Sequence, residues 1–497
     1  METNTIIKGY INSNSTGNAY LINDEIDDLF IHKSNLNKAL HNDYVEVRVT
    51  KYRNSINGEV IEIIKRDRTE FVGTINIQKD FAFVRPSSKK INVDFYLPIG
   101  TYENIKEGEK VIIKMGKWNG KSPSAKVIKR LGTPGENEVE ICSIMHEYDI
   151  KNGFDEKVLR EVGKISELIT DEEIEKRRDF RELVTIAIDP EGCRDRDDAI
   201  SYQKLPNGNT NVGIHIADVT HYVKKGTELD KEAHKRGTSV YLVDRVIPML
   251  PEKLSNDICS LNKGTDKLTY SFIFTFDKNN NIIDQWFGKG IVNLNETLSY
   301  ELAQEMIDNN DTTEIGKSLI DLNNIAKKLR DKRDIIEFDK QEISFKLDEN
   351  SKPIGIYVKK SQDTNKLIEE FMLLTNHKVG EFIFKKGKPS IYRAHDRPDI
   401  DKIQELSEFI KDFGYTINSN AVDIKSELNK LLSDIKGKNE ENLISTLIVR
   451  AMPKAKCTSD KIHGHYGLSM EHYSWTTSPI RRYADIVLMR CLSDILY

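Results

Sequence analysis

The sequence predicts a multidomain chain in which two N-terminal all-β barrels, of the OB or cold-shock type, precede a large α/β (α+β) domain. Three observations predict this architecture. The chain has 497 residues, enough for about three domains of about 150 residues each. One pattern occurs twice within the first 115 residues. From Thr185 onwards, strand-like segments such as VTIAI alternate with helix-like segments.

The internal repeat places similar residues about 65 positions apart. Three pairs of residues mark it: Gly9 with Gly73, Tyr20 with Phe83, and Asp28 with Asp94. Each copy alternates apolar and polar residues over short runs that Gly, Asn and Asp interrupt, which is typical of strands. About five short strands in about 65 residues fit a small Greek-key barrel. We therefore expect one barrel over residues 1–68 and a second over residues 69–132.

Aromatic residues lie on successive predicted strands of both copies, where they can stack the bases of a single-stranded nucleic acid. Because side chains alternate along a strand, about half of them are expected to fill the barrels instead. They are Tyr10, Tyr20, Phe30, Phe71, Phe81, Phe83, Phe95 and Tyr96. Residues 114–130 then carry six basic residues and no acid, so they indicate a basic track, with a solvated edge as the alternative. Its candidate contacts are Lys114, Lys117, Trp118 and Lys121.

Charge and composition limit the class of protein. With 74 Lys and Arg against 79 Asp and Glu, the net charge of −5 requires any nucleic-acid site to be local. No apolar run approaches the roughly 18–20 residues of a membrane span, so no membrane partner is expected. Five scattered cysteines without a Cys-x-x-Cys pair, and an N-terminus without a secretory signal pattern, predict a cytoplasmic protein.

Residues 133–180 are predicted to hold a linker and a helix. Gly132, Pro134 and Gly135 indicate a linker over residues 131–145. Within residues 155–180, apolar residues recur at helical spacing, which predicts one helix with an apolar face. They are Val158, Val162, Ile165 and Ile169. The remaining residues, 181–497, are expected to form one large domain.

Four aspartates lie at the end of one predicted strand and in the loop that follows it. They are Asp189, Asp195, Asp197 and Asp198. Like charges this close raise one another's pKa values and cost stability, a cost that divalent cations would relieve. Oxygen-only ligands favour Mg²⁺, with Mn²⁺ as the alternative. Metal bound by aspartates is typical of phosphoryl chemistry. A surface ladder of ion pairs with Arg194 and Arg196 is the alternative, although such a ladder needs no adjacent aspartates.

A second group of residues, near the C-terminus, contains Arg481 and Arg482 after a Ser-Pro turn. Guanidinium groups bind phosphate in a bidentate manner and stabilise charge that develops at a scissile phosphorus. His463, His465 and His472 with Cys457 suggest a zinc cluster. Their spacing fits no standard zinc site, so that hypothesis is disfavoured.

Together these motifs closely resemble the RNB catalytic domain of ribonuclease II and ribonuclease R, which the Dis3-type exosome nucleases share. The matching blocks occur in family order and include IDPEGCRDRDDAI (188–200), GIHIADVTHYV (213–223), IYRAHDRPD (391–399) and HYGLSMEHYSWTTSPIRRYADIVLMR (465–490). The repeated units resemble the two cold-shock domains that precede RNB in the family. The resemblance implies a monomeric enzyme that hydrolyses single-stranded RNA processively from its 3′ end with Mg²⁺. Nucleoside 5′-monophosphates would be the products, and DNA would not be a substrate.

The resemblance also implies roles for individual residues. The four aspartates correspond to the metal site, and Asp197 to the acid most directly tied to cleavage. Arg481, beside Arg482, corresponds to the arginine that contacts the scissile phosphate. The remaining correspondences are to residues that hold the last nucleotides of the RNA: Tyr241, Tyr300, Phe345 and Glu370.

The sequence departs from the family pattern at a few places. Arg196 stands between the acids where an apolar residue is usual, and Trp475-Thr476 replaces His-Phe. Because the sequence stops at Tyr497, comparison with the family leads us to expect an RNB domain that is C-terminally incomplete, without an S1 domain. Two other functions compete with the enzyme: an RNA-binding repressor or chaperone with a catalytically weak RNB domain, and a phosphoesterase for small molecules. The intact aspartates disfavour the first, and the paired barrels disfavour the second.

Overall fold

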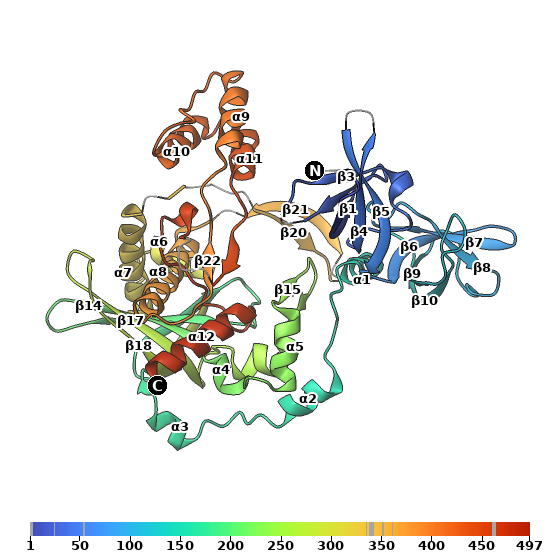
Figure 1. Ribbon diagram of the computed structural model, residues 1–497. Helices are drawn as coiled ribbons and strands as arrows, with labels where there is room; N and C mark the ends of the chain where they lie inside the picture. The colour runs from blue at the N-terminus through green and yellow to red at the C-terminus, as the bar shows by residue number, and fades with distance from the viewer. Residues whose placement is uncertain are drawn as a thin grey trace. The chain divides into compact units, whose positions relative to one another are not determined.

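A computed structural model describes residues 3–23, 25–52, 55–333, 335–336, 342–349, 352–359, 361–459 and 464–497 (Figure 1). The chain divides into two compact units. The first is Met1–Gly153 with Asp348–Lys352, and the second is Phe154–Leu347 with Pro353–Tyr497. Among the helices of the described ranges, none combines the length and the apolar character that crossing a membrane requires.

The first unit contains two five-stranded antiparallel sheets. The strands of the first sheet are β1 (Ile6–Ser13), β2 (Ala19–Ile22), β3 (Leu29–Ile31), β4 (Tyr44–Tyr52) and β5 (Ser55–Lys65). Those of the second are β6 (Glu70–Ile77), β7 (Phe81–Pro86), β8 (Phe95–Pro98), β9 (Lys110–Met115) and β10 (Ala125–Gly132). The orders β3-β2-β1-β4-β5 and β8-β7-β6-β9-β10 are the same pattern. The predicted pair of OB-type barrels is therefore confirmed.

Equivalent residues of the repeat occupy equivalent places in the two sheets. Gly9 lies in β1 and Gly73 in β6, and a Cβ atom at either would press into a carbonyl oxygen of the neighbouring strand, that of Ile22 or Arg85. Each sheet encloses its own apolar core. The matching glycines thus follow from the same close approach of two strands in each barrel.

Three helices connect the barrels to the large sheet: α1 (Asn137–Glu147), α2 (Glu156–Gly163) and α3 (Asp171–Glu175). The predicted single helix within residues 155–180 is wrong, because α2 ends at Gly163 and α3 begins after Thr170. The Thr170 side chain accepts a hydrogen bond from the Glu173 amide, which favours a new helix start there. Val158 and Val162 are buried, in keeping with the predicted apolar face. The segment interpreted as a linker, residues 131–145, contains most of α1.

The second unit is built on a seven-stranded sheet of order β11-β18-β17-β14-β13-β12-β19. Its strands are β11 (Arg178–Asp179), β12 (Thr185–Asp189), β13 (Asp198–Lys204), β14 (Thr210–Ala217), β17 (Asp266–Phe276), β18 (Ile282–Asn293) and β19 (Glu296–Ser299). The pairs β12–β19 and β11–β18 are parallel, and the other neighbours are antiparallel. This mixed sheet with its helices confirms the predicted α/β domain.

Both faces of the sheet are covered, because side chains alternate along each strand. Ile186 and Ile188 point into one apolar core and Ala187 into the other. The first core includes residues of α6 (Tyr300–Asp308), α7 (Glu314–Asp331), α8 (Asp363–Lys385) and α12 (Tyr483–Leu496). The second includes residues of α2, α4 (Val219–Tyr222) and α5 (Glu228–Arg236). Figure 1 shows α12 crossing the strands near the C-terminus.

The remaining elements lie outside the large sheets. The described pairs of strands outside the large sheets are β15 (Val240–Tyr241) with β16 (Val246–Ile247), β20 (Glu342–Leu347) with β21 (Pro353–Lys359), and β22 (Tyr392–Ala394) with β23 (Lys456–Thr458). Helices α9 (Ile400–Lys411), α10 (Ile424–Ile435) and α11 (Glu441–Ala451) enclose an apolar core of their own. Short 3₁₀ or π segments are η1 (Lys33–Asn35), η2 (Lys253–Ile258) and η3 (Tyr466–Leu468).

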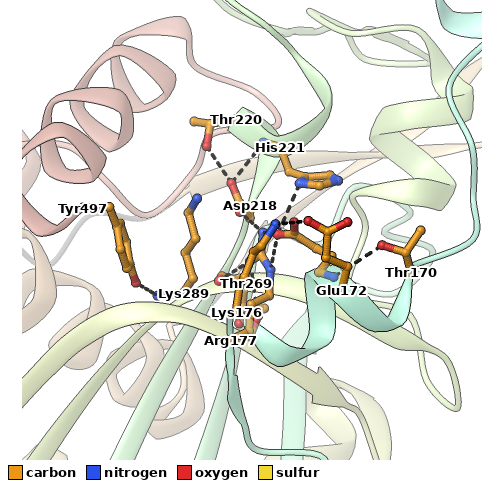
Figure 2. Close-up of polar contacts among 12 residues, drawn as sticks. Thr170, Glu172, Lys176, Arg177, Asp218, Thr220, His221, Thr269, Lys289 and Tyr497 are labelled. Carbon is orange, nitrogen blue, oxygen red and sulfur yellow. Dashed lines mark hydrogen bonds and ion pairs between the residues drawn. The ribbon is translucent and has the colours of Figure 1, made fainter.

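A buried ion pair ties the end of α3 to the loop after β14 (Figure 2). The Arg177 and Asp218 side chains are fully buried, and Arg177 Nη2 lies 2.7 Å from Asp218 Oδ2. Thr220 Oγ1 donates to the other carboxylate oxygen at 2.6 Å. Burial alone would raise the pKa of Asp218, but Arg177 and the Thr220 hydroxyl hold that pKa below its usual value.

We expect Arg177→Met to lower the free energy of unfolding by about 3–5 kcal/mol, because it leaves Asp218 buried without its cation. The matched control is Lys176→Met. Lys176 pairs with Glu172 on the exposed side of α3, and solvent screens such pairs, so the control should unfold like the parent chain. Urea titration measures both, and equal stabilities would contradict the structural role of Arg177.

Candidate active site

The four aspartates gather where β12 ends and β13 begins. Asp189 is the last residue of β12 and Asp198 the first residue of β13, while Asp195 and Asp197 lie in the connecting loop. The loop turns after Asp189 through Gly192, whose φ of 78° is readily adopted only by glycine. The antiparallel pairing of β12 and β13 therefore brings both ends of the predicted metal motif to one edge.

Asp189 and Asp195 share a neighbour, the thiol of Cys193. Its Sγ lies 3.7 Å from Asp189 Oδ1 and 3.6 Å from Asp195 Oδ1. Asp195 also accepts a hydrogen bond of 2.6 Å from the hydroxyl of Tyr241. Burial raises the pKa of Asp189 to about 6, and Arg196, with Nε 3.9 Å away, acts in the opposite direction. The loop thus holds both partly buried carboxylates around one thiol.

Asp197 is the most constrained of the four. Its side chain is buried, and Oδ1 accepts a 2.7 Å hydrogen bond from the backbone N–H of Ile480. The other oxygen, Oδ2, is buried and accepts no hydrogen bond from the described residues. Arg481 Nε faces that oxygen at 3.3 Å as an ion-pair contact. Burial raises the pKa of Asp197 well above its usual value, and Arg481 opposes that shift. The two predicted motifs, 283 residues apart in the chain, therefore meet here.

Asp198 and Tyr300 lie beside this group. Burial and, after it, the charge of Asp189 raise the pKa of Asp198 to about 7, although Arg481 opposes the shift. Burial also raises the pKa of the Tyr300 hydroxyl, and the next largest causes are the charges of Asp198 and Asp189. Tyr300 is the first residue of α6, which follows β19, and β19 pairs with β12. The sheet thus places Tyr300 near the aspartates, as expected for a residue of the same site.

The donors present fit a hard divalent cation. All four side chains offer oxygen, which Mg²⁺ and Mn²⁺ prefer. Asp197 Oδ2 is a buried oxygen without a hydrogen bond from the described residues, and after burial it is neighbouring carboxylate charge that raises two pKa values: Asp195 raises that of Asp189, and Asp189 raises that of Asp198. A bound cation would relieve both costs. Within the part of the chain that the structure describes, no three His, Cys, Asp or Glu side chains already adopt a metal-holding arrangement.

Arg481 and Arg482 differ in their surroundings. The Arg481 side chain is 46% exposed, and its Nη2 donates to Ser478 Oγ at 3.0 Å. Arg482 instead donates from Nη2 to the fully buried Asp485 at 2.7 Å, and its guanidinium lies 4.4 Å from the ring centre of Trp475. Asp485 Oδ1 also accepts from the Ser478 amide. Arg481 is thus available to a ligand, whereas Arg482 holds the loop together.

The remaining predicted RNA contacts of this unit lie in different environments. Tyr241 is 52% exposed and touches the aspartate loop through its hydroxyl. Phe345 lies on β20, opposite Ile356 of β21, and is 48% exposed. Glu370, on α8, is buried and paired with Arg333, and burial raises its pKa to about 7. No contact among the described residues joins Glu370 to the aspartates.

The predicted contacts of the barrels divide into buried and exposed groups. Phe71 and Phe95 fill the second barrel, whereas Tyr10, Tyr20 and Tyr96 are exposed. Phe81, Phe83 and Tyr96 contact one another across β7 and β8. In the basic track, Lys114 pairs with Glu70 and Trp118 packs partly against the second core. Lys117 and Lys121 are exposed.

Sequence reasoning missed several neighbours of the aspartates. The Ile480 amide carries no sequence signal, because any residue has one. Cys193 stands between Asp189 and Asp195 in the chain, yet its role as their shared neighbour depends on the loop conformation. The suggested zinc cluster includes His463, which lies outside the described residues.

Comparisons with known proteins agree with this architecture. The RNB domain family matches residues 177–497, the cold shock domain family residues 83–155, and the ribonuclease B OB domain family residues 9–63. Ribonuclease R of Thermotoga maritima is 36% identical over 487 residues, which cover 95% of this chain and 68% of that protein. Ribonuclease R of Aquifex aeolicus is 34% identical over 479 residues, which cover 94% and 68% respectively.

A solved structure supports the fold. Mycoplasma genitalium RNase R in complex with ribose-methylated single-stranded RNA superimposes with a TM-score of 0.92 at 24% identity, covering 99% of this chain and 79% of that one. The RNB match spans well over half of the chain, and it includes both the aspartate loop and Arg481. The chain therefore belongs to the ribonuclease II and ribonuclease R (RNB) family of exoribonucleases, with OB and cold-shock domains before the RNB domain.

Proposed function

We propose that this chain is a Mg²⁺-dependent, processive 3′→5′ exoribonuclease that degrades single-stranded RNA to nucleoside 5′-monophosphates. The observation that carries the proposal is the contact of Arg481 with buried Asp197, beside three further aspartates. A cationic side chain and a hard-ion donor set in one place suit the cleavage of a phosphodiester. We further propose that the enzyme acts as a cytoplasmic monomer, with Mn²⁺ as an alternative ion and without activity on DNA.

The residues of the candidate active site have different proposed roles in cleavage. Asp189, Asp195, Asp197 and Asp198 would hold the metal, which when bound activates water and neutralises charge at the phosphate. Arg481, half exposed and held by Ser478, would donate to the scissile phosphate as its charge grows. Ile480 fixes one oxygen of Asp197, and so keeps that carboxylate oriented while the other oxygen faces the arginine.

Exposed aromatic rings would hold the RNA end without reading its sequence, since every base has a π-face. Tyr241 reaches Asp195 with its hydroxyl, which would place its ring beside the terminal nucleotide. We propose that Tyr300 and Phe345 contact the same end of the RNA. The RNA contacts proposed for the barrels are Lys114, Lys117, Trp118 and Lys121. Glu370, buried against Arg333, would act indirectly. We propose the domains 1–68, 69–132, 133–180 and 181–497.

Removing divalent metal tests the proposed chemistry. Mononucleotide release from oligo(A) should stop in EDTA and return with excess Mg²⁺, because four aspartates cannot support cleavage without a cation. Chromatography of the products should show adenosine 5′-monophosphate. Full activity in EDTA, or adenosine 3′-monophosphate as the product, would contradict the proposal. RNA binding without release under any divalent ion would instead indicate an RNA-binding protein with a catalytically weak RNB domain.

A further inference from the structure

The first unit contains a cavity of about 390 Å³ that the proposed reaction does not use. Residues of both barrels and of the segment at the end of α1 line it. Its wall includes the largely buried ring of Phe71, and its rim the exposed ring of Tyr148. Ligand pockets for small molecules usually have volumes of about 300–1,000 Å³, so this cavity is large enough for a nucleotide.

The contact between His41 and Lys90 at this cavity is unfavourable as it stands. His41 Nδ1 accepts a hydrogen bond of 3.2 Å from the backbone N–H of Ser13, so the proton of the neutral ring is assigned to Nε2. Nε2 lies 3.1 Å from Lys90 Nζ, and an ammonium group can only donate. Burial and the charge of Lys90 both lower the pKa of His41, in keeping with a neutral ring. With this assignment of the ring proton, two donors face each other.

A shared acceptor would satisfy both donors. Among the described residues, the other recorded partner of Lys90 Nζ is Asn12 Oδ1, at 3.4 Å, and no carboxylate pairs with Lys90. Arg68 also lines the cavity. Its Nη1 donates to the Glu147 carbonyl and its Nε to Asp67, which leaves Nη2 without a recorded partner in the described part of the chain. The ring N–H of His41 and the cationic groups of Lys90 and Arg68 thus line the same cavity. Such a set of donors is typical of phosphate recognition.

Two carboxylates in the same cavity limit what can bind. Glu70, which pairs with Lys114 at 3.4 Å, and Glu147 both contribute to the lining. An RNA strand would bring several phosphates against them, and like charges repel. A phosphomonoester brings one anionic group and leaves hydroxyl and amino groups that can donate to carboxylates, as ribose hydroxyls do in dinucleotide sites.

We propose that this cavity binds a nucleoside monophosphate, with the phosphate between His41 and Lys90 and the nucleoside along Phe71 and towards Tyr148. The site is separate from the aspartates, and it does not depend on the proposed reaction. Because a nucleotide there would contact both barrels and the end of α1, occupancy would stabilise their arrangement within this unit.

Isothermal titration calorimetry with AMP, on the full chain in EDTA, tests the proposal. AMP should bind one to one, and more tightly than adenosine or inorganic phosphate alone. His41→Ala and Lys90→Met should each weaken AMP binding by about tenfold or more, because each removes a donor to a charged group. Lys89→Met is the matched control, since this neighbouring exposed lysine does not line the cavity, and it should bind AMP like the parent chain.

Two results would overturn the proposal. The first is no AMP binding, and the second is AMP affinity that Lys90→Met leaves unchanged. If Arg481→Ala abolishes that unchanged affinity, the nucleotide binds at the aspartates instead. RNA 12-mer binding that Lys90→Met weakens, without AMP binding, would assign the cavity to the RNA backbone. Lys90 is exposed, so its variant should fold like the parent chain, which circular dichroism checks.

Discussion

Asp197→Asn should reduce the rate of mononucleotide release by about 10³-fold or more, because it removes the buried carboxylate charge that faces Arg481 and the proposed metal. The asparagine Oδ1 can still accept from the Ile480 amide, so the loop should keep its conformation. Single-turnover assays with 5′-labelled oligo(A) measure the loss.

Two controls accompany this variant. Without metal, burial penalises the charged form of Asp197 in the folded state, so the neutral asparagine should leave the chain at least as stable. RNA binding, measured by filter retention, should remain, since Asp197 is buried and the proposed RNA contacts are other side chains. Activity within a fewfold of the parent would contradict the assignment of Asp197.

Arg481→Ala is expected to lower the single-turnover rate by about 10²–10³-fold, because it removes a donor aimed at developing phosphate charge. Its side chain is 46% exposed but faces the buried Asp197 carboxylate, so the free energy of unfolding should fall as well, by less than for a fully buried pair because solvent screens the arginine. Arg481→Lys should recover only part of the rate, since an ammonium group lacks the planar fork of guanidinium.

The neighbouring arginine provides a contrast. Arg482→Ala leaves the buried carboxylate of Asp485 without its cation, and it should cost about 3–5 kcal/mol in the free energy of unfolding. Urea titration and rate measurements on both variants separate the two roles. The proposed division fails if Arg481→Ala unfolds more easily than Arg482→Ala, or if both variants keep full activity.

The sequence predicts the parts of this fold that depend on local periodicity. Alternation and the matched glycines at positions 9 and 73 indicate the barrels, because the same short contact between strands recurs in each. The four aspartates are visible because carboxylates that close together are costly without a cation. The break between α2 and α3 could not be predicted in this way. It depends on the end of α2 at Gly163 and on the helix cap at Thr170, and the spacing of apolar residues indicates neither.

Long-range contacts account for what local patterns could not predict. The amide of Ile480 reaches Asp197 from 283 residues away, and the pairing of Glu370 with Arg333 connects α8 to the segment after α7. Both contacts depend on the packing of helices against the sheet. The cavity in the first unit likewise requires both barrels and the end of α1, so no single stretch of sequence indicates it.

The direction of cleavage tests the central claim most directly. A 5′-labelled single-stranded RNA incubated with the chain and Mg²⁺ should yield a ladder that shortens from the 3′ end, and Asp197→Asn should yield none. A duplex RNA with a blunt end should be cut more slowly, since stacked rings hold single strands. Internal cleavage products, shortening from the 5′ end, or a ladder that persists in Asp197→Asn would contradict the account.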